Sequence, residues 1–174
     1  MPIFLRDILV NPGFKYTFWM RMSAYLGQNK VFKYLLLYYC SAALLAHYRY
    51  KYGIDIPPAT QIGSGLLLPH FGGIVVHYDS IIGDNCTISQ GVTIGLAYRG
   101  ERRGCPIIRN NVYIGPGAKI IGSIKIGNDV AVGANCVVTK DVPDNAVVAG
   151  VPGEIISDKG SEGYVANKFD QGVN

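Results

Sequence analysis

The stretches IIGDNCTISQGVTIG (residues 81–95) and IIRNNVYIGPGAKIIGSIKIGNDVAVGANCVV (residues 107–138) share a pattern that repeats every six residues. β-Branched apolar residues recur at this spacing, at Ile82, Ile88, Ile94, Ile108, Ile114, Ile120, Ile126, Val132 and Val138. An amphipathic helix does not have a period of six, whereas a short fixed repeat is typical of solenoid proteins. The sequence therefore predicts an all-β solenoid, a parallel β-helix with three flat faces per coil and β-branched residues that point inward.

Glycine follows five of the inward residues, at positions 83, 95, 115, 127 and 133. These glycines are expected at the corners of the coil, where an unusual φ would exclude other residues. The residue two positions before each inward residue is small or apolar, so it is also expected to face the core, at Ser80, Cys86, Val92, Val112, Ala118, Ile124, Val130 and Cys136.

The repeat is interrupted twice. It begins at Ile62, with Leu68 and Ile74 as further inward positions, and then shifts in phase by two residues before Ile82. The second gap is larger, so residues 96–106 (LAYRGERRGCP) are expected to form an extruded basic loop. Insertions in solenoids usually lie on the binding face.

The 174 residues divide into three predicted parts. Residues 1–53 form an N-terminal helical cap with helices over 14–27 and 30–50, residues 54–153 form the β-helix, and residues 154–174 form a polar, mobile C-terminal tail. Pro143 and Pro152 are expected to end the strand ladder. Because an open solenoid end exposes its core, the helices are expected to pack on the first coil.

The net charge of +4 is uneven, with +6 in residues 1–53 and −2 in the remainder. The apolar run of 16 residues in the N-terminal segment, 31–46, contains Lys33 and is shorter than the roughly 20 residues that a membrane span needs. A basic, Tyr-rich segment of this kind also favours contact with the inner membrane surface. The sequence shows no nucleic-acid-binding motif and no signal peptide, so we expect a cytoplasmic protein.

The four cysteines, Cys40, Cys86, Cys105 and Cys136, have neither metal-site spacing nor a CxxC motif. This usage is typical of reduced thiols in a cytosolic protein. A zinc hydratase on this kind of fold would need three converging histidines. The chain has only His47, His70 and His77, and His47 falls in a predicted helix, so no metal site is predicted.

Residues 52–153 resemble the serine acetyltransferase family of hexapeptide acyltransferases. The likeness rests on DIPP (55–58), HFGGIV (70–75), the long loop, IGPGAKI (114–120) and DVPDNAVVAGVPG (141–153). The resemblance implies a left-handed parallel β-helix, a homotrimer, and acetyl-CoA as the donor substrate in the cleft between subunits.

The resemblance also implies that His70 is the general base and that Asp55, fifteen residues earlier, orients it. Acetyl transfer from a thioester to a hydroxyl requires removal of the hydroxyl proton, which a neutral imidazole does well near neutral pH. A carboxylate on the far ring nitrogen would fix the tautomer and stabilise the imidazolium. Gly72 and Gly73 leave room for a backbone N–H donor to the thioester oxygen. His77 and His47 are predicted to be structural.

For acetyl-CoA, the family uses backbone groups of the I-G-x-G turns. The matching positions here are Gly95, Gly115, Pro116, Gly133 and Ala134, and Lys140 lies where a cation could meet a CoA phosphate. The family's basic residue after the final V-P motif is missing, because Gly153 and Glu154 follow Pro152.

Two positions depart from the serine enzymes. Pro69 replaces the Asp before the catalytic His, and Gly104-Cys105-Pro106 replaces Arg-His-Pro in the loop. The replaced residues hold the amino-acid head group and carboxylate, and glycine cannot substitute for a bidentate arginine. The short N-terminal region also points to a single trimer.

With these departures, the chain resembles the capsular and exopolysaccharide branch of the family, whose members are taken to O-acetylate sugars. The sequence therefore predicts acetyl-CoA-dependent O-acetylation of a sugar hydroxyl in surface polysaccharide or its precursor. Three alternatives stay open: O-acetylation of serine or another small molecule, N-acetylation of an amino sugar, and a non-catalytic scaffold.

Overall fold

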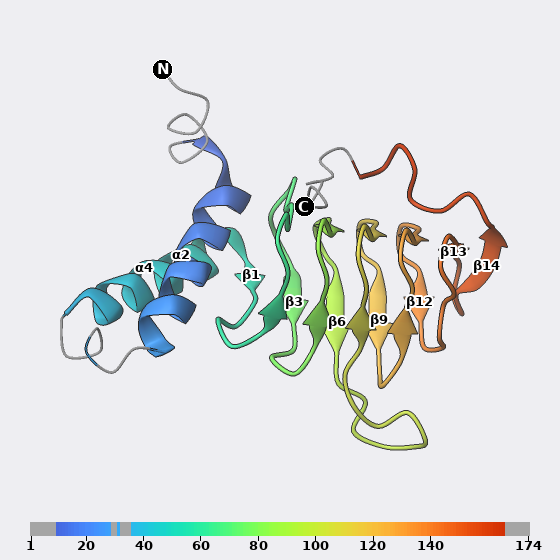
Figure 1. Cartoon of the computed structure of the whole chain (residues 1–174), viewed down its shortest axis with the longest axis horizontal. Helices are drawn as coiled ribbons and strands as arrows, with labels where there is room; N and C mark the ends of the chain where they lie inside the picture. The colour runs from blue at the N-terminus through green and yellow to red at the C-terminus, as the bar shows by residue number, and fades with distance from the viewer. Residues whose placement is uncertain (1–9, 29–30, 32–35, 166–174) are drawn as a thin grey trace, which may run out of the picture.

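A computed structural model of the chain describes residues 10–28, 31 and 36–165. Two N-terminal helices adjoin one end of a coil of short strands, and a single long loop projects from the middle of the coil (Figure 1).

The strands form three sheets, and consecutive strands lie in different sheets except for β13 and β14. Sheet A contains β1 (Ile54–Asp55), β3 (Ile74–Val76), β6 (Thr93–Gly95), β9 (Lys119–Ile121) and β12 (Val137–Val138). Sheet B contains β2 (Gln61–Ile62), β4 (Ile81–Ile82), β7 (Ile107–Ile108) and β10 (Lys125–Ile126). Sheet C contains β5 (Thr87–Ile88), β8 (Tyr113–Ile114), β11 (Ala131–Val132), β13 (Val147–Ala149) and β14 (Glu154–Ser157). Every pairing is parallel except that of β13 with β14, so the described chain forms the predicted three-sided parallel β-helix.

The six-residue repeat builds the core as predicted. None of the nine inward β-branched residues is more than 3% exposed, and the residues two positions before eight of them are at most 1% exposed. Each coil therefore contributes branched side chains to one continuous apolar stack, and this burial drives the fold.

The glycines that follow inward residues serve a different purpose from the one expected. None of the five has a positive φ. A Cβ on Gly83 would instead lie 2.8 Å from the carbonyl carbon of Arg109, and one on Gly115 would lie 2.8 Å from the carbonyl oxygen of Val132. The expectation about φ was wrong, and at Gly83, Gly115 and Gly127 glycine is instead needed for the close approach of backbone in the next coil.

Positive φ occurs two residues later, at the corner between sheets B and C. Asn85, Asn111 and Asp129 adopt φ of 55°, 58° and 55° there, as asparagine and aspartate tolerate better than most residues. Their side chains form a ladder: the Asn85 amide donates to Asn111 Oδ1, and the Asn111 amide donates to Asp129 Oδ1, both at 3.1 Å. We call this the ladder corner, comprising residues 84–85, 110–111, 128–129 and 144–145.

The first interruption of the repeat is a two-residue insertion. We call the segment that contains it, residues 69–80, the irregular coil. Leu67 pairs with Thr87, 20 positions ahead, whereas Val76 pairs with Ile94, 18 positions ahead. The insertion therefore lies between Leu67 and Val76. It shifts the register so that Val76, rather than the predicted Ile74, occupies the place in line with Ile94, although both side chains are buried.

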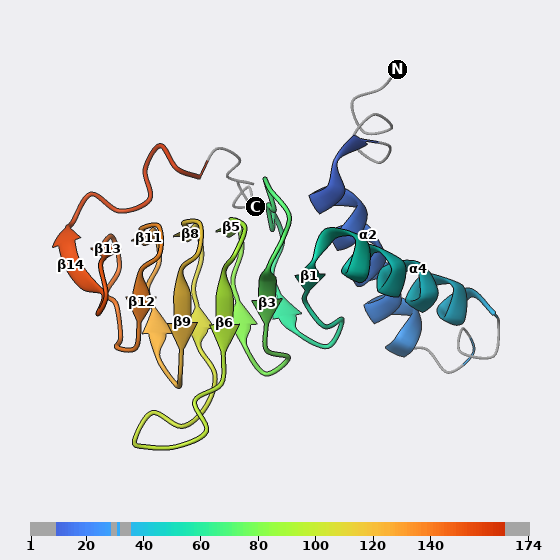
Figure 2. The same ribbon diagram turned by 180° about the vertical axis from the view of Figure 1, so that it is seen from behind.

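Helices α2 (Pro12–Gln28) and α4 (Leu37–Tyr52) pack on each other and cover the N-terminal end of the coil (Figures 1 and 2). Tyr16, Met20, Leu45 and Tyr52 of these helices join the buried core cluster. The first part of the predicted second helix falls on residues 30 and 32–35, which lie outside the described residues.

None of the described helices is long and apolar enough to cross a bilayer. On α4, the side chains of Leu37, Tyr39 and Tyr50 are exposed. Contact of residues 1–53 with a membrane surface stays a prediction.

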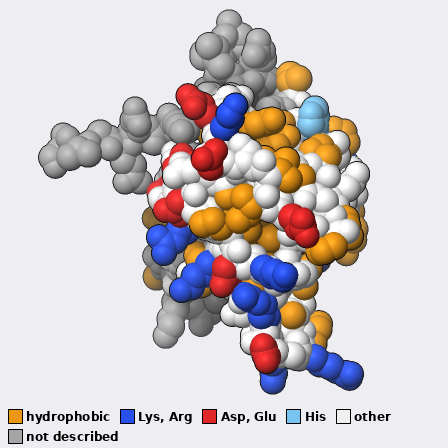
Figure 3. Space-filling model, turned by 90° about the vertical axis from the view of Figure 1, so that its right-hand side faces the viewer, with side chains coloured by type: hydrophobic (Ala, Val, Ile, Leu, Met, Phe, Trp, Pro, Cys, Tyr) orange, Lys and Arg blue, Asp and Glu red, His pale blue; other side chains and the backbone are white. Residues whose placement is uncertain are grey.

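The predicted loop 96–106 projects from the coil between β6 and β7 (Figure 1). Its base is closed by two hydrogen bonds between Ala97 and Gly104, of 3.0 and 3.1 Å. Arg102 forms an ion pair of 3.1 Å with Asp141, and basic side chains gather in the lower part of the face seen in Figure 3, toward which the loop projects.

The ladder continues beyond the point where it was expected to end. β13 pairs with β11 after Pro143, and β14 then adds an antiparallel strand within the range 154–174 that the sequence assigned to a tail. Ser161 is fully buried, and its hydroxyl donates to the carbonyl oxygen of Asn111 at 2.6 Å. The prolines did not stop the sheet because they lie outside its strands.

Candidate active site

His70 lies in the two-residue insertion of the irregular coil, and its side chain is exposed. The backbone on either side is held by the helical cap. Leu68 is buried and packs beneath Gly13 of α2, and the Phe71 ring lies 5.5 Å from the ring of Tyr52 in α4. The imidazole of His70 forms no hydrogen bond or ion pair with any described residue. The position of His70 is thus fixed while its ring is left open to react.

The turn after His70 consists of Gly72 and Gly73, which adopt φ of 104° and 66°. Residues with a side chain rarely adopt such values, and Gly73 also approaches Gly91 in the next coil. The Gly72 carbonyl accepts a hydrogen bond of 2.8 Å from the Gly91 amide. The amides of Gly72 and Gly73 themselves donate to no described backbone acceptor. The N–H groups of Gly72 and Gly73, two and three residues after His70, are thus available to a ligand oxygen.

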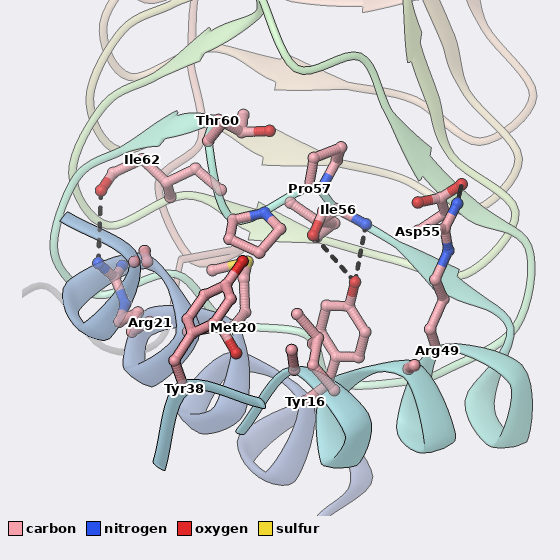
Figure 4. A pocket seen from close by; sticks show the side chains of 18 of the residues that line it. Tyr16, Met20, Arg21, Tyr38, Arg49, Asp55, Ile56, Pro57, Thr60 and Ile62 are labelled. Atoms are coloured by element: carbon pink, nitrogen blue, oxygen red, sulfur yellow. Dashed lines mark hydrogen bonds and ion pairs between the residues drawn. The ribbon is translucent and has the colours of Figure 1, made fainter. Parts of the chain in front are cut away.

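Asp55 lies on the outward face of sheet A, directly opposite Val75 in the next coil. Its carboxylate pairs with the Arg49 guanidinium of α4 at 2.6 Å, as Figure 4 shows. Among the described residues no hydrogen bond or ion pair joins Asp55 to His70. The structure therefore joins the predicted pair by neither a hydrogen bond nor an ion pair, and Arg49 engages only Oδ2 of the Asp55 carboxylate.

A cavity of about 690 Å³ lies between α2, α4 and the first coil (Figure 4). Arg49 and Asp55 line it at one end and Arg21 at the other, where the Arg21 guanidinium donates to the carbonyl oxygens of Ile62 and Gly63. Sequence reasoning missed this cavity, because only the packing of the cap on the coil creates it.

Tyr16 joins the cap to the first coil at the floor of this cavity. Its hydroxyl donates to the carbonyl oxygen of Ile56 at 3.0 Å and accepts from the Ile56 amide at 2.9 Å. Burial raises the pKa of Tyr16 to about 12, so the hydroxyl keeps its proton at neutral pH. Tyr16 is therefore a structural link.

The residues predicted to hold acetyl-CoA are divided between two corners. Gly115 and Gly133 follow β8 and β11, which pair in register, so these glycines and the adjacent Pro116 and Ala134 stack in successive coils between sheets C and A. Gly95 is the last residue of β6 and Lys140 follows β12, so both lie where the chain leaves sheet A for sheet B. Four of the six residues are therefore brought together.

A further group of reactive side chains was missed. His77, Asp79 and Cys105 lie together at the corner between sheets A and B, although 28 residues separate His77 from Cys105. The pairing of Ile81 with Ile107 brings residues 79 and 105 into adjacent coils, and it is the one feature that could have predicted this group. Burial raises the pKa of the Cys105 thiol and the Asp79 charge adds to the rise, while the nearby Ser80 hydroxyl acts in the opposite direction.

Comparison with known proteins adds to this picture. Residues 105–140 match a family profile described as bacterial transferase hexapeptide (six repeats). The chain is 36% identical over 153 residues to a serine acetyltransferase of Synechococcus elongatus, covering 87% of this chain and 60% of that protein. It is 37% identical over 157 residues to a serine acetyltransferase of Staphylococcus aureus, covering 86% of this chain and 73% of that protein.

Among solved structures, the chain is similar to serine acetyltransferase from Brucella abortus strain S19 in complex with coenzyme A. The TM-score is 0.76 at 34% identity, over 92% of this chain and 62% of that one. The chain thus spans about three fifths of the length of two of these relatives. The likeness implies the left-handed form of the coil.

The narrower prediction of a capsular or exopolysaccharide branch finds no support in these proteins, which are all named serine acetyltransferases. The S. aureus protein is 37% identical to this chain over 73% of its own length, a likeness that extends through most of both proteins. The chain belongs to the serine acetyltransferase family of hexapeptide-repeat acyltransferases.

Proposed function

We propose that this chain is an acetyl-CoA-dependent O-acetyltransferase in which His70 is the general base. The observation that carries the proposal is the exposed imidazole at the two-residue insertion, held in place by both helices and followed by two glycine amides. A rigid backbone with a side chain left unpaired is what a base needs in order to meet a substrate hydroxyl.

The reaction is a direct transfer. His70 takes the proton of the acceptor hydroxyl as its oxygen attacks the thioester carbonyl, and an amide of Gly72 or Gly73 donates to the carbonyl oxygen as negative charge develops there. The carbon–sulfur bond then breaks, and the imidazolium returns its proton to the coenzyme A thiolate. The products are an O-acetyl ester and free coenzyme A, and no covalent enzyme intermediate is needed.

Asp55 is proposed to orient His70 and stabilise the imidazolium, which requires its carboxylate to reach the imidazole from its position beside Arg49. Asp55→Asn keeps the size of the side chain but removes its charge. We expect turnover to fall by at least about 10-fold while KM for acetyl-CoA stays the same. An unchanged turnover would remove Asp55 from the mechanism.

Acetyl-CoA is the proposed donor, bound along the corner that carries Gly115, Pro116, Gly133 and Ala134, with Gly95 and Lys140 contributing from the neighbouring corner. Glycine leaves the backbone accessible to an extended pantetheine arm, and an exposed ammonium such as that of Lys140 can pair with a phosphate. A homotrimer is proposed as the working assembly, which light scattering on the purified chain would test.

Serine is the first acceptor to test, because the three relatives described above are all named serine acetyltransferases. The assay measures thiol release from acetyl-CoA as acceptor is added. Saturable, acceptor-dependent release with L-serine would support serine as the substrate. Release with neither serine nor any other hydroxyl compound, from a folded protein, would contradict the proposed O-acetyltransferase activity.

A sugar hydroxyl is the second candidate acceptor, and one feature of the loop base favours it. Gly104 adopts φ of 135°, and a Cβ there would lie 3.0 Å from Cβ of Ser123. An arginine cannot occupy this position without moving the backbone, so the loop base lacks the family's bidentate carboxylate contact. Thiol release with free sugars but not with L-serine would decide for this acceptor.

A further inference from the structure

His77, Asp79 and Cys105 offer three metal-binding atoms at one corner of the coil. The three atoms all lie within 4.8 Å of one another, with Cys105 Sγ 3.1 Å from His77 Nδ1 and Asp79 Oδ2 3.9 Å from the same nitrogen. The part of the chain that the structure describes contains no other group of three such side chains. None of these residues has a role in the reaction proposed above.

We propose that His77, Asp79 and Cys105 form a binding site for a divalent transition-metal ion of the zinc class. Thiolate, imidazole and carboxylate together are the ligand types that zinc takes, and sulfur disfavours magnesium and calcium. Three protein ligands leave one tetrahedral position for water or another ligand.

The observed distances fit the edges of a tetrahedral site. With Zn–S of about 2.3 Å and Zn–N and Zn–O of about 2.0–2.1 Å, tetrahedral angles place sulfur about 3.5 Å from nitrogen and nitrogen about 3.3 Å from oxygen. The present separations of 3.1 and 3.9 Å lie on either side of these values. These two edges need shifts of about half an ångström, and the sulfur–oxygen edge, now at most 4.8 Å, has to shorten to about 3.5 Å, a change that rotation of the exposed Asp79 side chain can supply.

The backbone that carries the three ligands is rigid. His77 directly follows β3, and its amide donates to Ile94 in the next coil at 2.8 Å. Asp79 lies in the turn closed by the 3.0 Å hydrogen bond from the Ser80 amide to the His77 carbonyl. Cys105 is fixed between the bridge at Gly104 and the 3.1 Å hydrogen bond from the Ile81 amide to the Pro106 carbonyl. The ligands are thus pre-positioned by the coil rather than by a free loop.

Binding requires two local changes at the imidazole. The metal replaces the proton shared between Cys105 Sγ and His77 Nδ1, so one proton leaves to solvent as a thiolate–metal bond forms. The Asp79 amide, which lies 3.2 Å from the same ring nitrogen, must give up that contact. A bound ion would then cross-link the irregular coil to the base of loop 96–106.

The test is a titration of the reduced, chelator-treated full chain with Co²⁺. A tetrahedral site containing Cys105 should give intense visible bands together with a near-ultraviolet thiolate-to-cobalt transition, and Zn²⁺ should abolish both at one equivalent. Cys105→Ser should lose the thiolate band, and both Cys105→Ser and His77→Ala should weaken Co²⁺ binding by about 100-fold or more.

Cys40→Ser is the matched control, because Cys40 is an exposed thiol on α4, far from the corner in sequence. It should bind Co²⁺ as the unaltered chain does. Zn²⁺ should also raise the unfolding temperature of the unaltered chain but not that of Asp79→Asn. Absence of a thiolate band in the unaltered chain, or its loss in Cys40→Ser but not in Cys105→Ser, would overturn the proposal. Circular dichroism separates these outcomes from loss of fold.

Discussion

The ladder corner and the irregular coil are built from the same repeat but use their polar side chains differently. At the ladder corner, Asn85, Asn111 and Asp129 are hydrogen-bonded from one coil to the next, and their positive φ matches residue types that tolerate it. In the irregular coil, His70 is exposed without a described partner and His77 faces a thiol. The first region uses its polar groups for stability, and the second keeps them available for chemistry.

The difference shows how a repeat protein can carry a site. Where the register is kept, polar groups such as Asn85, Asn111 and Asp129 meet their equivalents in the next coil and form hydrogen bonds there. The two-residue insertion before Val76 and the loop before Ile107 break that register. Groups at the breaks have no equivalent neighbour, so the breaks are where reactive side chains can remain unpaired.

The largest expected effect comes from His70→Ala. Turnover should fall by about 10²–10⁴-fold, because the hydroxyl proton would have no base to receive it. Steady-state thiol release measures this loss, and chemical denaturation measures stability, which should stay within about 0.5 kcal/mol because the side chain is exposed. Near-normal turnover would reject His70 as the base, and the irregular coil would then have no demonstrated part in the reaction.

Asn111→Ala tests the opposite side of the comparison. The change removes two side-chain hydrogen bonds and places alanine at a φ of 58°, so the free energy of unfolding should fall by about 2–3 kcal/mol. Urea denaturation measures the loss. Asn111→Gly is the control that relieves the backbone cost but not the lost bonds, so it should be the less destabilised of the two. Equal stability of both variants would show that backbone conformation contributes little.

Tyr16→Phe tests the link between the cap and the first coil. Loss of the hydroxyl leaves the Ile56 amide and carbonyl without their partner, which should cost about 1–2 kcal/mol of unfolding free energy.

The folded-state pKa of Tyr16, about 12, lies above the ordinary value of 10.0. The Tyr16 contribution is therefore complete below pH of about 10 and is lost as the pH rises toward 12. Over that range the variant should lose less stability than the unaltered chain. A steeper loss in the variant would contradict the assignment.

The smallest effect is expected from Arg49→Gln. Both partners of the ion pair with Asp55 are substantially exposed, at 52% and 36%, so the free energy of unfolding should change by less than about 1 kcal/mol. Turnover should not fall, because Arg49 has no part in the proposed mechanism. A loss of activity similar to that of Asp55→Asn would show that the pair acts as a unit and would assign Arg49 a role in the site.

Much of the architecture followed from periodicity alone. The nine inward residues, the small residues two positions before them and the loop 96–106 were all readable, because the six-residue period is a local property of the chain. The reason for the glycines at Gly83 and Gly115 was not readable. Steric approach and positive φ select the same residue, and only coordinates separate them.

The sequence by itself determined the solenoid and its inward face, since both depend on residue type and spacing along one chain, and the resemblance to serine acetyltransferases pointed to His70 as the candidate base. The tertiary structure decided what meets what: Asp55 with Arg49 instead of His70, and Cys105 with His77 across an inserted loop. The physical reason is register. Contacts between coils depend on how many residues each turn contains, and a two-residue insertion or a long loop changes every such pairing locally while leaving the repeat on either side intact.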